Sequence, residues 1–129
     1  MDLHTAANAV PPLHGTELGN LLDDLDGIHA GIDLIRDGVR LLALERMTAE
    51  QTQLAVVTLA GSADGTDVLT LIGHLVARLT NPDSNPALRA LDLNAQKDCQ
   101  LHGELLVHDL GDDDLHQHAS DASGAIHTD

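Results

Sequence analysis

The chain has 129 residues and a mass of 13.6 kDa, which predicts one domain and excludes a large multidomain enzyme. Its 21 acidic and 6 basic residues give a formal net charge of −15, which argues against nucleic-acid binding, because phosphate contacts need clustered Lys and Arg. Since the chain has no Phe, Trp or Tyr, its core must be aliphatic.

The same composition argues against a membrane protein. An anionic membrane surface would repel the acidic chain, and no apolar run approaches the roughly 20 residues of a membrane span. The first residues carry no basic segment followed by an apolar core, so we expect no secretory signal. The single Cys99 cannot form an internal disulfide, which suits a reducing compartment. We therefore expect a cytoplasmic protein.

Residues 1–15 are expected to form an irregular lead, because Pro11 and Pro12 disfavour a helix. The strongest pattern follows over residues 17–46, where apolar residues alternate at spacings of three and four, with Thr16 as N-cap. A continuous helix of about 30 residues would be about 45 Å long. This heptad seam is the predicted interface, and it consists of Leu18, Leu21, Leu25, Ile28, Ile32, Ile35, Val39 and Leu42.

Three glycines are the weak points of this predicted helix. Gly27, Gly31 and Gly38 each cost about 1 kcal/mol relative to Ala inside a helix. Packing must offset that cost, or the helix breaks near Gly38. Gly27 and Gly31 are four residues apart and would share a helix face, which either allows close approach of another helix or reflects tolerated glycines and a kink.

Two further helices have clear start signals. Thr48 and Gln51 fit a capping box, which predicts a helix over residues 49–60 that ends at Gly61. Thr66 or Asp67 then caps a helix that reaches about residue 80. That segment has a one-sided apolar stripe formed by Val68, Leu71, Ile72, Leu75, Val76 and Leu79.

The last predicted helical segment begins at Pro86 and runs to about residue 110, although its polar middle also allows two shorter helices. Residues 111–129 are polar and rich in Asp and His, which predicts disorder. The expected fold is therefore all-α: a small bundle of about four helices over residues 16–110, with a long first helix and a disordered acidic His-containing C-terminal tail. The first helix is too long for its neighbours to cover, which predicts a homodimer.

Histidines are the candidate metal ligands. His116 and His118 lie beside three aspartates, and imidazoles two residues apart can bind Zn²⁺, Ni²⁺ or Cu²⁺ weakly. The alternative is a solvated acidic tail without a metal. His29, with Asp26 and Asp33 nearby in the helical register, suggests either a pH-sensitive interface residue or an ordinary surface ion pair.

Catalytic patterns are weak. Cys99 and His102 are three residues apart and could activate a thiolate, but a packed thiol and a core or boundary histidine explain them better. His74 falls on the polar face of its helix. No Glu is followed by His three residues later, and the chain has no phosphate-binding loop and no nucleophile elbow. We expect no catalytic residue, no cofactor and no enzyme activity.

Three functions remain as hypotheses. The first is a small acidic helical protein-interaction or oligomerisation module, acting as a homodimer or with another protein partner. The second is an acidic decoy for a basic protein surface, based on the cluster Asp23, Asp24, Asp26, Asp33 and Asp37. The third is weak divalent-metal binding through the His-containing tail.

Overall fold

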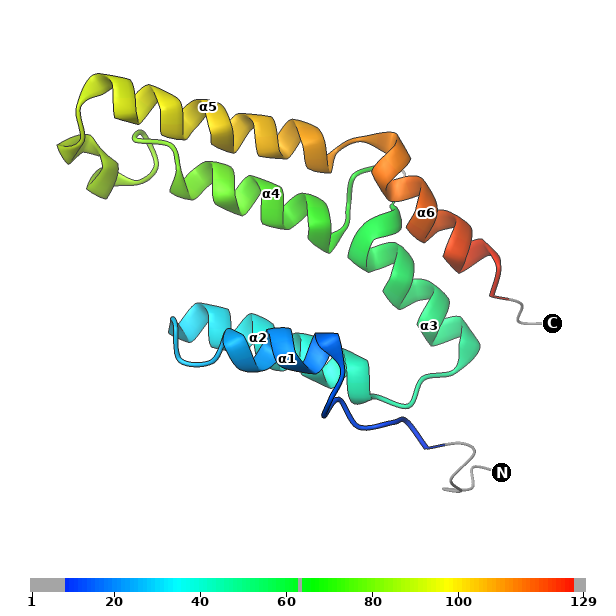
Figure 1. Ribbon diagram of the computed structural model, residues 1–129. Coiled ribbons are helices and arrows are strands. Elements are labelled where there is room, and N and C mark those ends of the chain that lie inside the picture. The colour runs from blue at the N-terminus through cyan, green and yellow to red at the C-terminus, as the bar shows by residue number, and fades with distance from the viewer. Residues whose placement is uncertain (1–8, 63, 127–129) are drawn as a thin grey trace. The chain divides into compact units, whose positions relative to one another are not determined.

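The computed structural model describes residues 9–62 and 64–126, and within them every regular element is helical (Figure 1). The predicted all-α fold is confirmed. The chain divides into two compact units, Met1–Met47 and Thr48–Asp129, and the boundary falls inside the predicted bundle domain. The first unit holds α1 (Glu17–Asp24) and α2 (Ala30–Leu44); the second holds α3 (Ala49–Val56), the π-helical turn η1 (Val57–Gly61), α4 (Val68–Leu79), the 3₁₀ turn η2 (Pro86–Ala90), α5 (Leu93–Leu110) and α6 (Asp113–Gly124).

The predicted continuous helix over residues 17–46 is wrong. Thr16 caps α1 as expected, since its Oγ1 accepts a hydrogen bond of 3.0 Å from the Gly19 N–H, but α1 ends at Asp24. Gly27 then adopts a left-handed backbone with φ of +75°, which turns the chain. The Gly27 N–H donates to Asp33 Oδ1 at 3.1 Å, and His29 caps α2.

The other glycines of this segment behave differently. Gly38 lies inside α2, so the helix does not break there. Because Gly27 is in the turn and Gly31 is in α2, the two do not share one helix face. The predicted close-approach face is therefore absent.

The predicted starts of the next two helices are confirmed. Thr48 and Gln51 form the capping box through bonds of 2.9 and 3.1 Å, and α3 continues into η1, which ends at Gly61. Asp67 caps α4 by accepting the Thr70 N–H at 2.8 Å. These caps involve residues within three positions of one another, which is why the sequence predicts them.

The segment after Pro86 forms two elements. Asn85 caps the short η2, and Asp92 then caps α5, an uninterrupted helix of 18 residues. The polar middle of this segment therefore does not split the helix. The break comes earlier, between η2 and α5, where Leu91 and Asp92 have extended backbones.

The predicted disordered tail is also wrong over residues 113–124, which form α6; residues 127–129 lie outside the described part. Helix α6 lies beside α3 and η1 (Figure 1). Gln53 Nε2 donates to the carbonyls of Ser123, at 3.1 Å, and Ile126, while Ser123 Oγ donates to the Gln53 carbonyl at 3.2 Å. Composition suggests disorder because the segment has few apolar residues, whereas hydrogen bonds hold it in place.

Small residues line the contact between α4 and α5, which lie side by side (Figure 1). A Cβ at Gly103 would collide with Thr80 Oγ1 and would lie 3.2 Å from Ala77 Cα. A Cβ at Gly73 would lie 3.1 Å from Leu110 Cδ1. The backbones of α4 and α5 therefore approach closely at these small residues.

Replacement of Gly27 tests the break between α1 and α2. Gly27→Ala is expected to lower the free energy of unfolding by about 1–2 kcal/mol, because a Cβ is strained in the left-handed region. The control Gly38→Ala is expected to raise it by up to about 1 kcal/mol, because a Cβ there meets no atom within 4 Å. Urea unfolding followed by circular dichroism measures both. If Gly27→Ala instead stabilised the protein, the result would contradict the turn at Gly27 and support a continuous helix over residues 17–46.

Replacement of Gly103 tests the close approach of α4 and α5. Gly103→Ala is expected to destabilise the protein by about 1–3 kcal/mol, because the added methyl group forces two backbones apart. Gly124→Ala is the control, since its Cβ meets nothing within 4 Å, and it should change stability by less than about 0.5 kcal/mol. Equal thermal midpoints for the two variants would contradict this packing.

Candidate functional site

Exposed apolar side chains are the main feature of the surface. In the described part of the chain Leu22 is the one large apolar side chain that is buried, at 3% exposure. In contrast, 21 large apolar side chains are exposed. A residue that is exposed here is not covered by its own unit. The chain therefore presents far more apolar surface than its two small units can bury within themselves.

The predicted seam does not form one continuous stripe. Leu18 and Leu21 lie on α1, Leu25 and Ile28 lie in the turn, and the remaining four lie on α2. Six of the eight residues are exposed, and two, Ile32 and Val39, are half-buried. The seam therefore contributes apolar surface on both sides of the Gly27 turn rather than along a single long helix.

Sequence reasoning missed a second apolar stripe on α2. Leu34 and Leu41 are 73% and 69% exposed, which makes Leu34 the most exposed large apolar side chain described. With Gly38 they follow the spacing i, i+4, i+7, so all three share one helix face. This heptad spacing was the signal available in the sequence, but the stronger neighbouring seam obscured it.

Helix α4 carries a third apolar face. Gly73 and Ala77 lie against α5, and four of the six large residues of the predicted stripe are exposed. Its most exposed member is Leu71, at 64%. The exposed members are Val68, Leu71, Leu75 and Leu79, whereas Ile72 and Val76 are half-buried. We call these four residues the α4 face.

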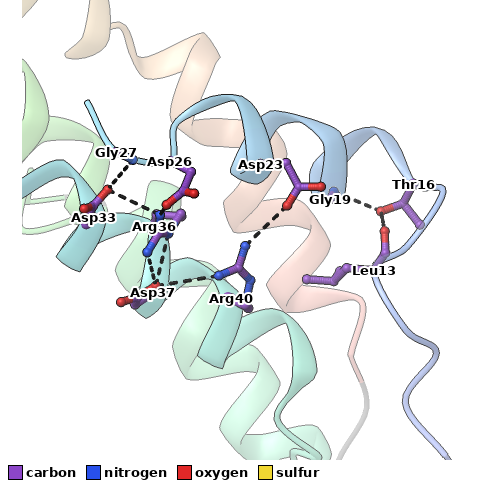
Figure 2. Close-up of polar contacts among 10 residues, drawn as sticks. All are labelled: Leu13, Thr16, Gly19, Asp23, Asp26, Gly27, Asp33, Arg36, Asp37 and Arg40. Carbon is purple, nitrogen blue, oxygen red and sulfur yellow. Dashed lines mark hydrogen bonds and ion pairs between the residues drawn. The ribbon is translucent and has the colours of Figure 1, made fainter. Parts of the chain in front are cut away.

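Two arginines pair with four of the five aspartates of the acidic cluster, which keeps a net negative charge (Figure 2). Arg36 pairs with Asp26, with Asp33 at 3.3 Å and with Asp37 at 2.9 Å. The hydrogen bond with Asp37 is the main cause that raises the pKa of Arg36.

Arg40 extends the same cluster (Figure 2), since it lies 3.7 Å from both Asp23 and Asp37. Asp23 belongs to α1 and Asp26 to the turn, so these pairs link α1 and the turn to α2. Four of the five carboxylates proposed as a decoy surface are therefore paired within the unit.

His29 does not form the predicted pair with Asp26 and Asp33. Its Nδ1 accepts the Gly31 N–H at 2.9 Å, so the ring caps α2. The two carboxylates bind Arg36 instead. The correction has a physical reason: the predicted contacts required a continuous helix through the Gly27 turn.

The structure separates the two weak metal candidates. His118 is exposed, whereas His116 is buried on α6. His116 Nδ1 lies 2.7 Å from the Ala60 carbonyl oxygen and 2.9 Å from Asp67 Oδ2, and Nε2 lies against the Leu110 carbonyl oxygen. Both ring nitrogens are occupied, so His116 is not a metal ligand here. Among the described residues no group of three His, Cys, Asp or Glu side chains could hold a metal ion.

The remaining candidates form no catalytic arrangement in the described part of the chain. Cys99 is a half-buried free thiol on α5, and His102 on the same helix is exposed. No hydrogen bond between the two side chains is described. His74 on α4 is exposed, as its position on the polar face predicted.

Comparisons with known proteins give no relative. No family model matches the chain, and neither a curated protein nor a solved structure matches it. Across residues 9–62 and 64–126, none of the helices combines the length and the apolar character that crossing a membrane requires.

The arginine cluster makes a testable prediction for the first unit. Arg36→Gln is expected to lower the urea midpoint, because Asp26, Asp33 and Asp37 lose their shared positive charge and repel one another. The loss should shrink at about 1 M NaCl, where the screening length is about 3 Å. Arg78→Gln, at an exposed position of α4, is the control and should leave the midpoint unchanged. A loss of equal size at high salt would contradict a charge-based role.

Proposed function

We propose that this chain is a small acidic helical protein-interaction or oligomerisation module without catalytic activity, and that it associates with a second copy of itself. The proposal rests on the contrast, over residues 9–62 and 64–126, between one buried and 21 exposed large apolar side chains. Soluble monomers rarely leave large contiguous apolar patches in water. The faces concerned are the Leu34–Leu41 stripe of α2, the seam residues and the α4 face.

The free energy gained by burying these apolar faces supports the proposal that a partner covers them. Burying a Leu or Val side chain completely contributes roughly 1.5–3 kcal/mol. The four residues of the α4 face are about half exposed, so covering them would contribute roughly 3–6 kcal/mol. That is a large part of the roughly 5–15 kcal/mol by which a domain is stable.

The available area supports a second copy as the occupant. At half exposure, the 21 side chains of the described residues present on the order of 1,000 Å² of apolar surface, divided between the two units. Each partner of a stable dimer contributes about 800 Å². The internal pairing of Arg36 and Arg40 with four aspartates also reduces the repulsion that two acidic copies would otherwise meet at α1 and α2.

The alternatives have less support. A decoy for a basic protein would need free carboxylates, and four of the five in the cluster are already paired. Weak metal binding by the C-terminal segment would need a free nitrogen on His116. The expected cytoplasmic location, and action without nucleic acid or membrane, remain parts of the proposal.

Substitution of the α2 stripe tests the association. The double variant Leu34→Glu, Leu41→Glu is expected to raise the Kd for self-association at least about 100-fold, because two leucines per copy lose their apolar burial. Both positions are highly exposed in the isolated chain, so the fold should persist. Asn20→Glu with Asn94→Glu is the control, since it adds the same charge at exposed polar positions. Sedimentation equilibrium measures both Kd values.

The salt dependence of binding distinguishes a second copy of this chain from a basic protein partner. Two copies that each carry −15 repel one another, so their association should tighten as salt is raised. Binding to a basic partner should instead weaken with salt. A wild-type chain that stays monomeric at every concentration and salt level would overturn the second-copy proposal, since the apolar faces would then be covered within one copy or by a different protein.

A further inference from the structure

The His116 ring is surrounded by hydrogen-bond acceptors. The Ala60 carbonyl oxygen, at 2.7 Å, and Asp67 Oδ2, at 2.9 Å, face Nδ1, while the Leu110 carbonyl oxygen faces Nε2. Two of these groups are carbonyls and the third is a carboxylate, and none of them can donate when Asp67 is ionised. A neutral imidazole has one N–H and an imidazolium has two. Only the imidazolium can therefore donate on both sides of the ring.

This ring joins α6 to three other elements. Ala60 belongs to η1, Asp67 is the N-cap of α4, and Leu110 is the last residue of α5. The Asp67 side chain is completely buried and the His116 side chain is 11% exposed. The ion pair and its hydrogen bonds are therefore shielded from water, which strengthens them.

The rest of the α6 attachment is polar or small. At its C-terminal end the helix is bonded to Gln53 of α3 through Ser123 and Ile126. Leu115, the one large apolar residue within α6, is exposed. With little apolar burial to hold it, α6 depends on His116 at its N-terminal half.

The other titratable groups near the ring are acidic or distant. Asp113 of α6 lines the same hollow as His116, and Asp64 in the preceding loop is bonded to Ser62 and Thr66. At the end of α5, His108 and Asp109 line a neighbouring hollow with Asp112, the N-cap of α6, and Asp113. Helix η1 has no titratable residue.

The remaining elements add no charge beside the ring. The titratable residue of α3 is the exposed Glu50. Those of α4 are the exposed His74 and Arg78, and the remaining ones of α5 precede His108 along that helix. Neither these α4 and α5 groups nor Glu50 line the hollow that holds His116. Asp67 is thus the charged group in direct contact with His116.

We propose that α6 docks in a pH-dependent way: it is held against η1 and the ends of α4 and α5 while His116 is an imidazolium, and it is released when the ring loses a proton. On deprotonation one ring nitrogen turns a lone pair toward an oxygen, and the buried Asp67 loses its counter-charge. Release would uncover the side of α3 and η1 against which α6 lies. This inference does not depend on self-association.

The direction of the titration agrees with this arrangement. The hydrogen bond with the Leu110 carbonyl, opposed by burial and supported by Ala60 and Asp67, raises the pKa of His116 above 6.5. Docking is therefore fully present below about pH 6.5 and is lost as the pH rises through the raised value. Burial acts to raise the pKa of Asp67, but the hydrogen bonds from Thr70 and Ser62 lower it below 3.8, so Asp67 stays ionised throughout this range.

Amide hydrogen exchange of the full chain, followed by NMR between about pH 5.5 and 9, tests the proposal. After correction for intrinsic exchange, the opening constant of α6 should rise with pH by up to about tenfold per pH unit between about pH 6.5 and the raised pKa of His116, and level off above it, because one proton is linked to docking. The opening constants of α4 and α5 should not follow this slope. An α6 opening constant that does not change with pH would overturn the proposal.

Two histidines of α6 form a matched pair of variants. His116→Gln should leave α6 weakly protected at every pH, because a glutamine amide can donate on one side of the site and not on the other. His118→Gln, at the exposed position on the same helix, should keep the wild-type profile. A wild-type profile for His116→Gln would overturn the proposal.

The ring itself gives an independent measurement if His116→Gln fails to fold. The ¹⁵N chemical shifts of the wild-type ring should show two protonated nitrogens wherever α6 is protected, and loss of a proton over the same pH range in which α6 opens. A neutral ring at a pH where α6 remains fully protected would contradict the mechanism.

Discussion

Close backbone approach is the constraint on which the second unit depends. The chain has no aromatic residue, and α4 meets α5 at the small residues Gly73, Ala77 and Gly103, with Leu110 against Gly73. Such a contact is tight but leaves four large side chains of α4 exposed. A contact built on small residues therefore orders the helices and at the same time creates the apolar face that gives the protein its proposed role in association.

Where little apolar surface is buried, ion pairs and hydrogen bonds connect the helices. In the first unit, Arg36 and Arg40 link α1, the turn and α2 through four aspartates. In the second, a buried His116 beside Asp67 connects α6 to η1 and α5. Although the chain is strongly acidic, Arg36, Arg40 and His116 lie where they link helical elements. The ionic groups thus support the fold, while the apolar faces remain available for contact.

The sequence predicts the local features well because their causes are local. The caps at Thr16, Thr48 and Asp67 involve neighbouring residues and form as expected. The predictions that failed depend on contacts between residues far apart in the sequence, or on a choice between two conformations of the same segment. Periodicity alone cannot show that Gly27 takes a positive φ, that Gly73 rather than Leu71 faces α5, or that a polar segment docks through His116. The seam was predicted as one interface, whereas Leu34 and Leu41 appear only once the face of α2 is known to be exposed.

A second copy is proposed to cover the apolar faces of α2 and α4. The most direct measurement is an NMR experiment on a mixture of ¹³C-methyl-labelled and unlabelled chains, filtered for contacts between copies. Intermolecular contacts at the methyl groups of Leu34, Leu41 and Leu71 are the predicted result, because these are among the most exposed leucines of the two helices. Contacts confined to single copies at these methyl groups, in a sample of monomeric mass, would contradict the account.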